Sequence, residues 1–187
     1  MKRYIIISGE TSGDIYGSSL MKMIQKNHSE KVSFWGIGGD KMRAEGLYPL
    51  DDIDNISVVG FTEIIKKIPS IINLLDRISK FSNDIKPHGL ILIDFPGFNI
   101  NLAKRLKKKM KVQFPIIYFV SPQIWAWNKG RIKSIKKYID KMLVIFPFEE
   151  AFYKQYDIDA KYVGHPFLDE WIPSDKNKIK QELGLDV

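Results

Sequence analysis

Short apolar runs alternate with amphipathic stretches along most of this chain, and this alternation limits the folds that it can adopt. Strands are expected over the apolar runs at residues 4–8, 32–37, 88–94, 114–120, 141–146 and 160–164. Helices are expected between them, at residues 13–26, 40–45, 99–109, 129–138 and 148–156. Because buried strands that alternate with helices form βαβ units, the pattern predicts an α/β fold: a Rossmann-like parallel sheet with helices on both faces.

The composition fits a single folded domain and excludes several classes of site. The chain has 187 residues, of which 44% are hydrophobic, enough for one sizeable core. It has no cysteine, which excludes a disulfide framework, a thiolate zinc site and a cysteine nucleophile. The first apolar run ends at Gly9 and Glu10, so it predicts a buried strand and not a signal peptide.

The net charge of +7 points to an anionic partner. Nucleic acid, anionic lipid and phosphorylated ligands are the classes that a basic chain attracts. The sequence contains no nucleic-acid-binding motif, so we expect no nucleic acid partner. A lysine-rich solvated surface explains the charge equally well.

Polar residues follow the predicted strands. In parallel sheets, ligands bind at the carboxyl ends of the strands, where such residues lie. Asp94 comes directly after four apolar residues. At the mouth of a buried strand the pKa of its carboxyl is expected to rise, which suits a general base. Equally, Asp94 could cap the helix that is expected near Asn99. The Asn99 side chain in turn could cap this helix or donate to a ligand.

The turn after the first strand, "SGETSGD", presents a helix N-terminus to a possible ligand. Its glycine spacing matches neither a P-loop nor the dinucleotide fingerprint, so no nucleotide cofactor is expected. Glu10 and Asp14 lie in this turn, where their carboxylates either favour the helix dipole or bind sugar hydroxyls. Glu149 and Glu150 open a later helix and are expected to favour its dipole in the same way.

The histidines offer no metal site in the sequence. They lie at positions 28, 88 and 165, far apart along the chain, and metal ligands must converge. His165 follows the last predicted strand and is either a ligand contact or a hydrogen-bonded loop residue.

The segment at residues 61–81, "FTEIIKKIPSIINLLDRISKF", has isoleucine and leucine at helical spacing and lysine and arginine around them. Pro69 interrupts the pattern, so two helices are expected. The apolar side packs on the sheet or lies in a membrane interface. The candidates for membrane contact are Lys66, Lys67, Ile68, Ile71, Ile72 and Leu75.

Several segments together resemble the lipid-A-disaccharide synthase family: "SGETSGD", "GIGGDKM", "SVVGFTEII", "LIDFPGFN", "YFVSPQIWAWNKGR", "FPFEEAFY" and "YVGHPFLDE". They occur in family order from Tyr4 to about Trp171. The resemblance implies the N-terminal domain of a GT-B glycosyltransferase, which has two Rossmann-like domains and a cleft between them. Residues 1–172 would form the acceptor-side domain. Residues 173–187 would begin the linker or C-terminal domain, whose remainder is absent.

The resemblance also implies a reaction. The family transfers 2,3-diacylglucosamine from its UDP derivative to 2,3-diacylglucosamine 1-phosphate, with inversion and without a metal or cofactor. Asp94 matches the aspartate that would take the proton from the acceptor 6-hydroxyl. Glu10 and Ser12 would line the same cleft, and Asn99 and His165 are weaker candidates for substrate contact. Because both substrates carry acyl chains, the enzyme is expected to be cytoplasmic and peripheral on the inner membrane.

Trp125 and Trp127, in "WAW", have two possible uses under this resemblance. They could wall the acceptor pocket against acyl chains, with Arg131 near a phosphate. Alternatively, they could pin the loop after the strand against the core, which is expected for at least one of them.

The family is about twice as long as this chain, and its C-terminal half carries most of the nucleotide-binding residues. The chain alone is therefore expected to have little or no transferase activity and to need the missing half or a homodimer partner. The alternative is a non-catalytic module that binds a membrane or an acylated glycolipid.

Overall fold

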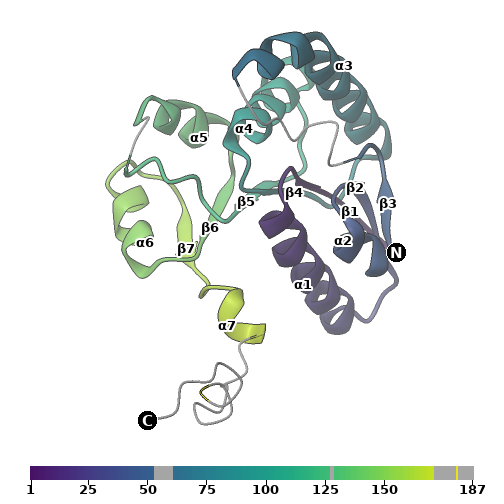
Figure 1. Ribbon diagram of the computed structural model, residues 1–187, viewed down its shortest axis with the longest axis horizontal. Coiled ribbons are helices and arrows are strands. Elements are labelled where there is room, and N and C mark those ends of the chain that lie inside the picture. The colour runs from purple at the N-terminus through teal and green to yellow at the C-terminus, as the bar shows by residue number, and fades with distance from the viewer. Residues whose placement is uncertain (53–60, 127–128, 171–179, 181–187) are drawn as a thin grey trace.

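The computed structural model describes residues 1–52, 61–126, 129–170 and Lys180, without the side chains of residues 61–67 and 169–170. In this part of the chain the strands form one sheet in the order β3-β2-β1-β4-β5-β6-β7. Every neighbouring pair is parallel (Figure 1). The strands are β1 (Lys2–Ser8), β2 (Val32–Ile37), β3 (Leu47–Pro49), β4 (Gly89–Ile93), β5 (Ile116–Phe119), β6 (Lys141–Val144) and β7 (Ala160–Tyr162).

Helices connect the strands and cover the sheet. They are α1 (Thr11–Asn27), α2 (Asp40–Ala44), α3 (Phe61–Ile85), α4 (Pro96–Arg105), α5 (Ile132–Tyr138), α6 (Pro147–Lys154) and α7 (Phe167–Glu170). A π-helix, η2 (Leu106–Met110), continues α4, and a single 3₁₀ turn, η3 (Lys129–Arg131), precedes α5. The α/β architecture expected from the alternating pattern is confirmed.

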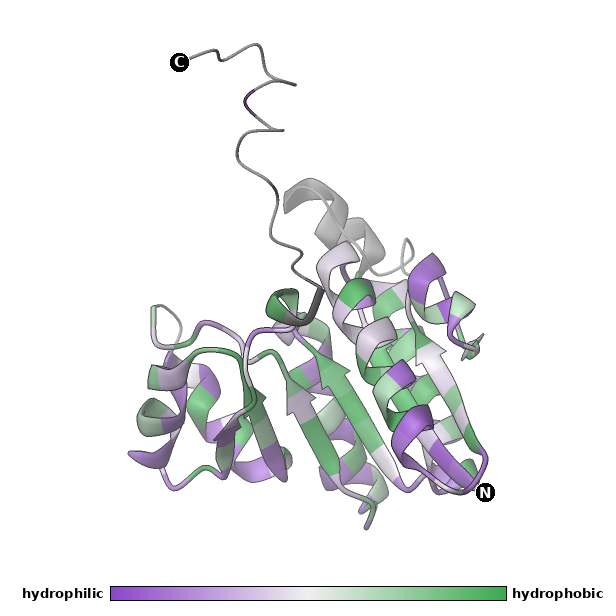
Figure 2. Cartoon of the chain, turned by 90° about the horizontal axis from the view of Figure 1, so that it is seen from below, coloured by the Kyte–Doolittle hydropathy of each residue, from purple (hydrophilic) through white to green (hydrophobic). Residues whose placement is uncertain are grey.

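The two faces of the sheet have separate hydrophobic cores. One core packs the sheet against α3, α4, α5 and α6, with Leu74, Leu102, Ile135 and Tyr153 from these helices. The other packs it against α1 and α2 through Met21 and Met42. Burial on both faces explains the long apolar runs of the central strands, as in β4, where every residue is buried. Figure 2 shows the hydrophobic strands in the interior and the more hydrophilic surfaces of the helices outside.

Two expectations about elements need correction. Pro69 does not divide its segment, because α3 is one helix of 25 residues with the proline inside it. Pro69 lies on an exposed stretch of α3, so water can solvate the carbonyl that loses its helical partner. The short edge strand β3 was not expected; it carries the exposed Tyr48 and too few residues to show a pattern.

The expected tail at residues 173–187 lies outside the described residues except for Lys180. The proposed boundary at residue 172 therefore remains a prediction. The described domain reaches α7, which ends at Glu170.

Candidate active site

The carboxyl ends of β1 and β4 meet where the strand order reverses. From β1 the chain winds outward through β2 to β3, whereas from β4 it winds the other way through β5 and β6 to β7. Ligands bind to open α/β sheets at such a point. Glu10 follows β1 and Asp94 follows β4. The fold therefore brings together two carboxylates that are far apart in the sequence.

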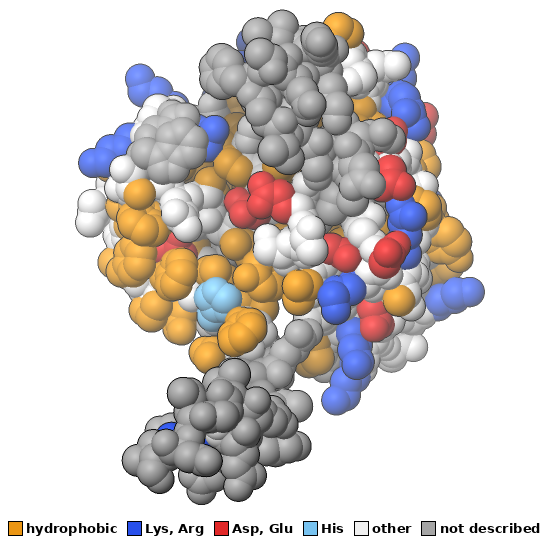
Figure 3. Space-filling model, in the orientation of Figure 1, with side chains coloured by type: hydrophobic (Ala, Val, Ile, Leu, Met, Phe, Trp, Pro, Cys, Tyr) orange, Lys and Arg blue, Asp and Glu red, His pale blue; other side chains and the backbone are white. Residues whose placement is uncertain are grey.

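A pocket of about 220 Å³ lies beside this point. Its lining combines one carboxylate, one guanidinium and neutral polar side chains with apolar walls. The lining residues are Asp94, Pro96, Val120, Ser121, Pro122, Gln123, Ile124, Arg131, Ile145 and Phe146. Figure 3 shows a group of acidic side chains near the middle of the molecule, with hydrophobic side chains next to them.

Burial is the main influence on the Asp94 carboxyl. It raises the pKa of Asp94 from 3.8 to about 6, and the nearby negative charge of Glu10 acts in the same direction. A hydrogen bond from the backbone of Phe95 partly opposes the rise in pKa. The alternative role of Asp94, as a helix cap, is not observed, because α4 begins at Pro96 and has no side-chain cap. Asp94 is thus a partly desolvated carboxylate at the pocket wall.

The backbone at the ends of β4 and β5 is strained. Asp94, Phe95 and Val120 have φ values of 42°, 46° and 60°, in the left-handed region that side chains other than glycine rarely adopt. Val120 is β-branched, which makes its conformation especially unfavourable. Gly9 permits the neighbouring turn, because a Cβ there would lie 2.5 Å from the Phe95 ring. Strain of this kind gathers at functional sites.

Asn99 is a structural residue, which corrects its assignment as a substrate contact. Its side chain is fully buried, and Nδ2 donates to the carbonyl oxygens of Ile93 at 3.1 Å and Asp94 at 2.8 Å. The Tyr118 hydroxyl also donates to the Asp94 carbonyl. These bonds hold the strained backbone of Asp94 from inside the core, where a ligand could not reach Asn99.

Trp125 is pinned to α6. Its Nε1 donates to Oε1 of Glu149 at 3.2 Å, and its ring packs edge-on against Phe148 at 5.0 Å. This geometry agrees with the prediction that one tryptophan fastens the loop after the strand. Trp127 lies outside the described residues, so its expected contact with the substrate remains a prediction.

The other expected contacts differ in their relation to the pocket. Arg131 lines it, whereas Glu10 acts on it through its charge. Ser12 is exposed on the first turn of α1. His165 is not among the lining residues; its ring packs against Tyr16 and Phe146, and Nδ1 accepts from the Phe167 N–H at 3.2 Å. These contacts favour the interpretation of His165 as a loop residue.

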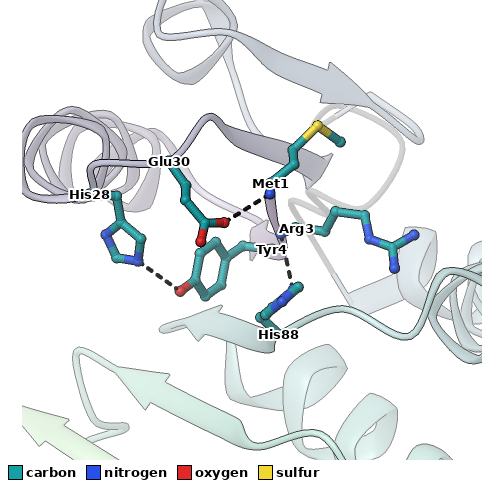
Figure 4. Close-up of polar contacts among 6 residues, drawn as sticks. All are labelled: Met1, Arg3, Tyr4, His28, Glu30 and His88. Carbon is teal, nitrogen blue, oxygen red and sulfur yellow. Dashed lines mark hydrogen bonds and ion pairs between the residues drawn. The ribbon is translucent and has the colours of Figure 1, made fainter.

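The other two histidines lie around Tyr4 of β1, and His88 directly precedes the amino end of β4. His28 and His88 both pack against the Tyr4 ring, with centroids 6.2 and 6.4 Å away (Figure 4). His88 Nδ1 accepts from the Arg3 N–H, and the N-terminal amine pairs with Glu30. They are therefore not as isolated as their sequence spacing suggested. In the described residues no group of three or more His, Asp or Glu side chains gathers for a metal ion.

A second cavity, of about 460 Å³, is a groove between α3 and the end of α4 with η2. Its apolar side has Ile68, Ile71, Ile72 and Leu75, and its polar side has Asn101, Lys104, Arg105, Lys108 and Lys109. Ile68 and Ile72 are 45% and 48% exposed. Leu75 is a correction to the expected membrane contacts, because it is 8% exposed and packs in the core. The side chains of Lys66 and Lys67 lie outside the description.

Two buried carboxylates were misjudged from the sequence. The sequence predicts that Glu149 favours a helix dipole, and that Asp14 either favours a helix dipole or binds sugar hydroxyls. Asp14 instead caps a different helix, α2, by accepting from the N–H groups of Gly39, Lys41 and Met42 at 2.8–3.0 Å. The only sequence signal was the glycine pair before α2, which leaves the backbone N–H groups accessible.

The sequence matches the family model described as lipid-A-disaccharide synthetase over residues 4–187. It is 44% identical over its whole length to the lipid-A-disaccharide synthase of Trichlorobacter lovleyi, of which it covers 48%. The chain spans about half the length of the curated relatives it matches.

Two solved structures share the fold. UDP-GlcNAc 2-epimerase from Neisseria meningitidis bound to UDP-GlcNAc is 10% identical, with a TM-score of 0.62 over 100% of this chain and 54% of that one. The apo form of the lipopolysaccharide outer core galactosyltransferase WaaB is 18% identical, with a TM-score of 0.53 over 88% of this chain and 46% of that one. These likenesses show the fold of one half of a GT-B protein.

Proposed function

Because this chain belongs to the lipid-A-disaccharide synthetase family, we propose that it forms the acceptor half of a glycosyltransferase of lipid A biosynthesis. The acceptor is 2,3-diacylglucosamine 1-phosphate, and the donor is UDP-2,3-diacylglucosamine. The products are the β(1→6)-linked disaccharide 1-phosphate and UDP. The observation that carries the proposal is Asp94, whose pKa is raised to about 6 in a pocket at the point where the strand order reverses.

Asp94 is the general base in this reaction. Its carboxylate takes the proton from the acceptor 6-hydroxyl while the oxygen attacks C1 of the donor sugar. The bond from C1 to the UDP oxygen breaks, and UDP leaves with that electron pair, so the configuration at C1 inverts. A base acts best when its pKa lies near the working pH. With a pKa of about 6, Asp94 is mostly ionised at neutral pH yet more basic than a surface aspartate.

Arg131 is our candidate for the phosphate contact, because it lines the same pocket as Asp94. A guanidinium binds phosphate through paired hydrogen bonds and keeps its charge at any working pH. Ser121 and Gln123, which also line the pocket, can bond to sugar hydroxyls. Glu10 and Ser12 remain candidates for the β1 side of the cleft.

The donor site is proposed to lie on a second domain that the relatives carry in their other half. Without that domain, or a second copy that replaces it, the chain has little or no transferase activity. The proposed partners are therefore the other half that the relatives carry or a homodimer partner. If the acceptor binds but no completed enzyme turns over, the non-catalytic glycolipid-binding module becomes the better description.

We propose that the groove beside α3 contacts the inner membrane from the cytoplasmic side. The exposed Ile68 and Ile72 would enter the acyl region, and Lys104, Lys108 and Lys109 would meet anionic headgroups. Within the described residues, no helix is both long and apolar enough to cross a membrane. A surface of this kind would bring the pocket to substrates that are anchored by their acyl chains.

The test of the catalytic proposal is turnover in a completed enzyme. This chain is fused to the second half of the Trichlorobacter lovleyi relative. Disaccharide formation is then compared for the original fusion and its Asp94→Ala and Asp94→Asn variants. Loss of the base is expected to lower kcat by about 100-fold or more, while the circular dichroism spectrum stays unchanged. Asp84→Asn, an exposed position on α3, is the matched control. Near-normal turnover of Asp94→Ala would remove Asp94 from the role of base.

A further inference from the structure

The inner side of α6 holds the loop that forms one wall of the Asp94 pocket. Glu149 and Tyr153 lie one turn apart on this helix, and both are buried, at 1% and 0% exposure. The Tyr153 hydroxyl donates to the Pro122 carbonyl at 3.4 Å. Glu149 Oε1 accepts from Ser121 Oγ at 2.5 Å and from Trp125 Nε1 at 3.2 Å. The loop after β5 is thus bonded to α6 at three points.

Glu149 does more than cap its own helix. Its other oxygen, Oε2, accepts from the Phe146 N–H at 3.1 Å and so caps the start of α6. A carboxylate in the first turn of a helix need not be buried, as the exposed Glu150 illustrates. Burying a carboxylate is costly unless donors compensate it. In Glu149 each oxygen has such donors, and those on Oε1 come from a different loop.

The groups bonded to Glu149 shape the pocket. Ser121 and Phe146 both line it, one after β5 and the other after β6. Ser121 follows Val120, whose φ of 60° must be held by surrounding contacts. Trp125 continues the same loop and packs on Phe148. One buried carboxylate therefore connects the walls that two neighbouring strands contribute.

We infer that Glu149 is a positioning residue for the acceptor: it holds the loop after β5 so that Ser121 and its neighbours bind the polar part of the acylated sugar phosphate. This inference rests on the proposed function, because it assumes that the acceptor occupies the pocket. Glutamine at this position has the same size but only one acceptor atom. It cannot accept from the β5 loop and from the Phe146 N–H at once.

The test is the affinity of the 187-residue chain for 2,3-diacylglucosamine 1-phosphate in detergent, by calorimetry at a temperature where every variant is folded. Glu149→Gln is expected to weaken binding by about tenfold. The matched control, Glu150→Gln, changes an exposed neighbour whose carboxylate accepts from the Tyr162 N–H, and it should bind like the original chain. Thermal unfolding of each variant separates effects on the fold from effects on affinity.

A double-mutant cycle tests whether Glu149 affects the affinity for the acceptor through Ser121. If Ser121 acts through its bond to Glu149, Ser121→Ala and Glu149→Gln together should weaken binding no more than the stronger single change. Ser121→Ala also keeps the test valid if Glu149→Gln does not fold. Unchanged affinity in Glu149→Gln despite lower thermal stability would overturn the inference. It would also be overturned if the losses of binding free energy from Ser121→Ala and Glu149→Gln add fully in the double variant. If the original chain is folded but does not bind the acceptor, the proposed function fails and this inference with it.

Discussion

At the scale of single residues, the buried carboxyl of Asp94 lowers the stability of the fold near neutral pH, and the same raised pKa suits it to the proposed role of base. Its carboxyl has a pKa of about 6 in the folded chain and an ordinary value of 3.8. The folded state therefore binds the proton more tightly than the unfolded state does. Stability from this group is present at low pH and is lost as the pH rises from about 4 to about 6. Such a penalty is typical of functional sites.

Asp94→Asn is accordingly expected to stabilise the chain at pH 7.5. We expect a gain in the free energy of unfolding of about 1 kcal/mol, reduced from the full shift because Asp94 is partly exposed. The gain should shrink below pH 6 and vanish near pH 4. Urea unfolding over this pH range measures it, with Asp84→Asn as the control for loss of one charge. A variant that is less stable than the original chain at pH 7.5 would contradict the raised pKa.

Asp14 illustrates the opposite case, a carboxylate that stabilises the fold. It accepts three backbone hydrogen bonds at the start of α2. Asp14→Ala leaves these donors without their acceptor and should lower the free energy of unfolding by about 2–3 kcal/mol. The exposed Asp40, in the first turn of α2, is the control, and Asp40→Ala should cost less than about 1 kcal/mol. Equal losses in the two variants would mean that Asp14 acts only through its charge.

At the scale of elements, α3 has one buried side and one side that the described contacts leave exposed. Ile78 is 1% exposed and belongs to the core, whereas Ile68 and Ile72 are about half exposed. A pattern of helical spacing cannot distinguish these residues, because each lies near the apolar stripe. The tertiary contacts separate the side that packs on the sheet from the side that stays exposed.

The exposed side of α3 should bind anionic vesicles. Ile68→Ser together with Ile72→Ser is expected to lower vesicle binding in a sedimentation assay by about tenfold, because two aliphatic side chains that would enter the membrane are lost. Met23→Ser with Val163→Ser is the matched control, since it removes two side chains that are similarly exposed elsewhere, at 50% and 45%. Unchanged binding of the α3 variant, or an equal loss in the control, would show that α3 is not the membrane contact.

The orientation of α6 likewise decides which of its residues are buried. Its first turn contains two adjacent glutamates, which look alike in the sequence. Only Glu149 turns inward, because α6 packs its Tyr153 side on the sheet and Glu149 lies one turn before Tyr153. The orientation of the helix on the sheet, and not its composition, makes one of them a contact of the β5 loop.

At the scale of the whole molecule, the chain corresponds to half of its relatives. It spans 48% of the Trichlorobacter lovleyi synthase, and 54% of the epimerase chain that shares its fold. A cleft between two domains needs both of its walls. In the proposed function the described residues supply one wall, with the pocket that Asp94 and Arg131 line.

We therefore expect no steady release of UDP from the purified chain when both diacylglucosamine substrates are given in detergent. Addition of the separately purified second half of the Trichlorobacter lovleyi relative should restore release and disaccharide formation. Acceptor binding by the chain alone is the control that shows that it is folded and competent. Steady release without the second half would mean that this chain, alone or as a dimer, builds a working donor site.

The sequence by itself determined the class of fold and placed the candidate site at the carboxyl ends of the strands. Apolar runs alternating with helices specify parallel strands, and polar residues after those runs must lie at their carboxyl ends. Asp94 and the family resemblance followed from such local patterns. These features depend on residues that are close together in the chain, so a linear pattern records them.

Only the tertiary structure decided which polar residues face the pocket and which support it. Asn99 and Glu149 are buried supports, Asp14 caps a helix that is not its own, and Leu75 belongs to the core. Asn99 bonds to carbonyls shortly before it in the chain, but the roles of Glu149, Asp14 and Leu75 depend on contacts between elements that the crossover connections bring together. Spacing along the chain does not encode those contacts, because the partner of each side chain lies on another strand end or another helix.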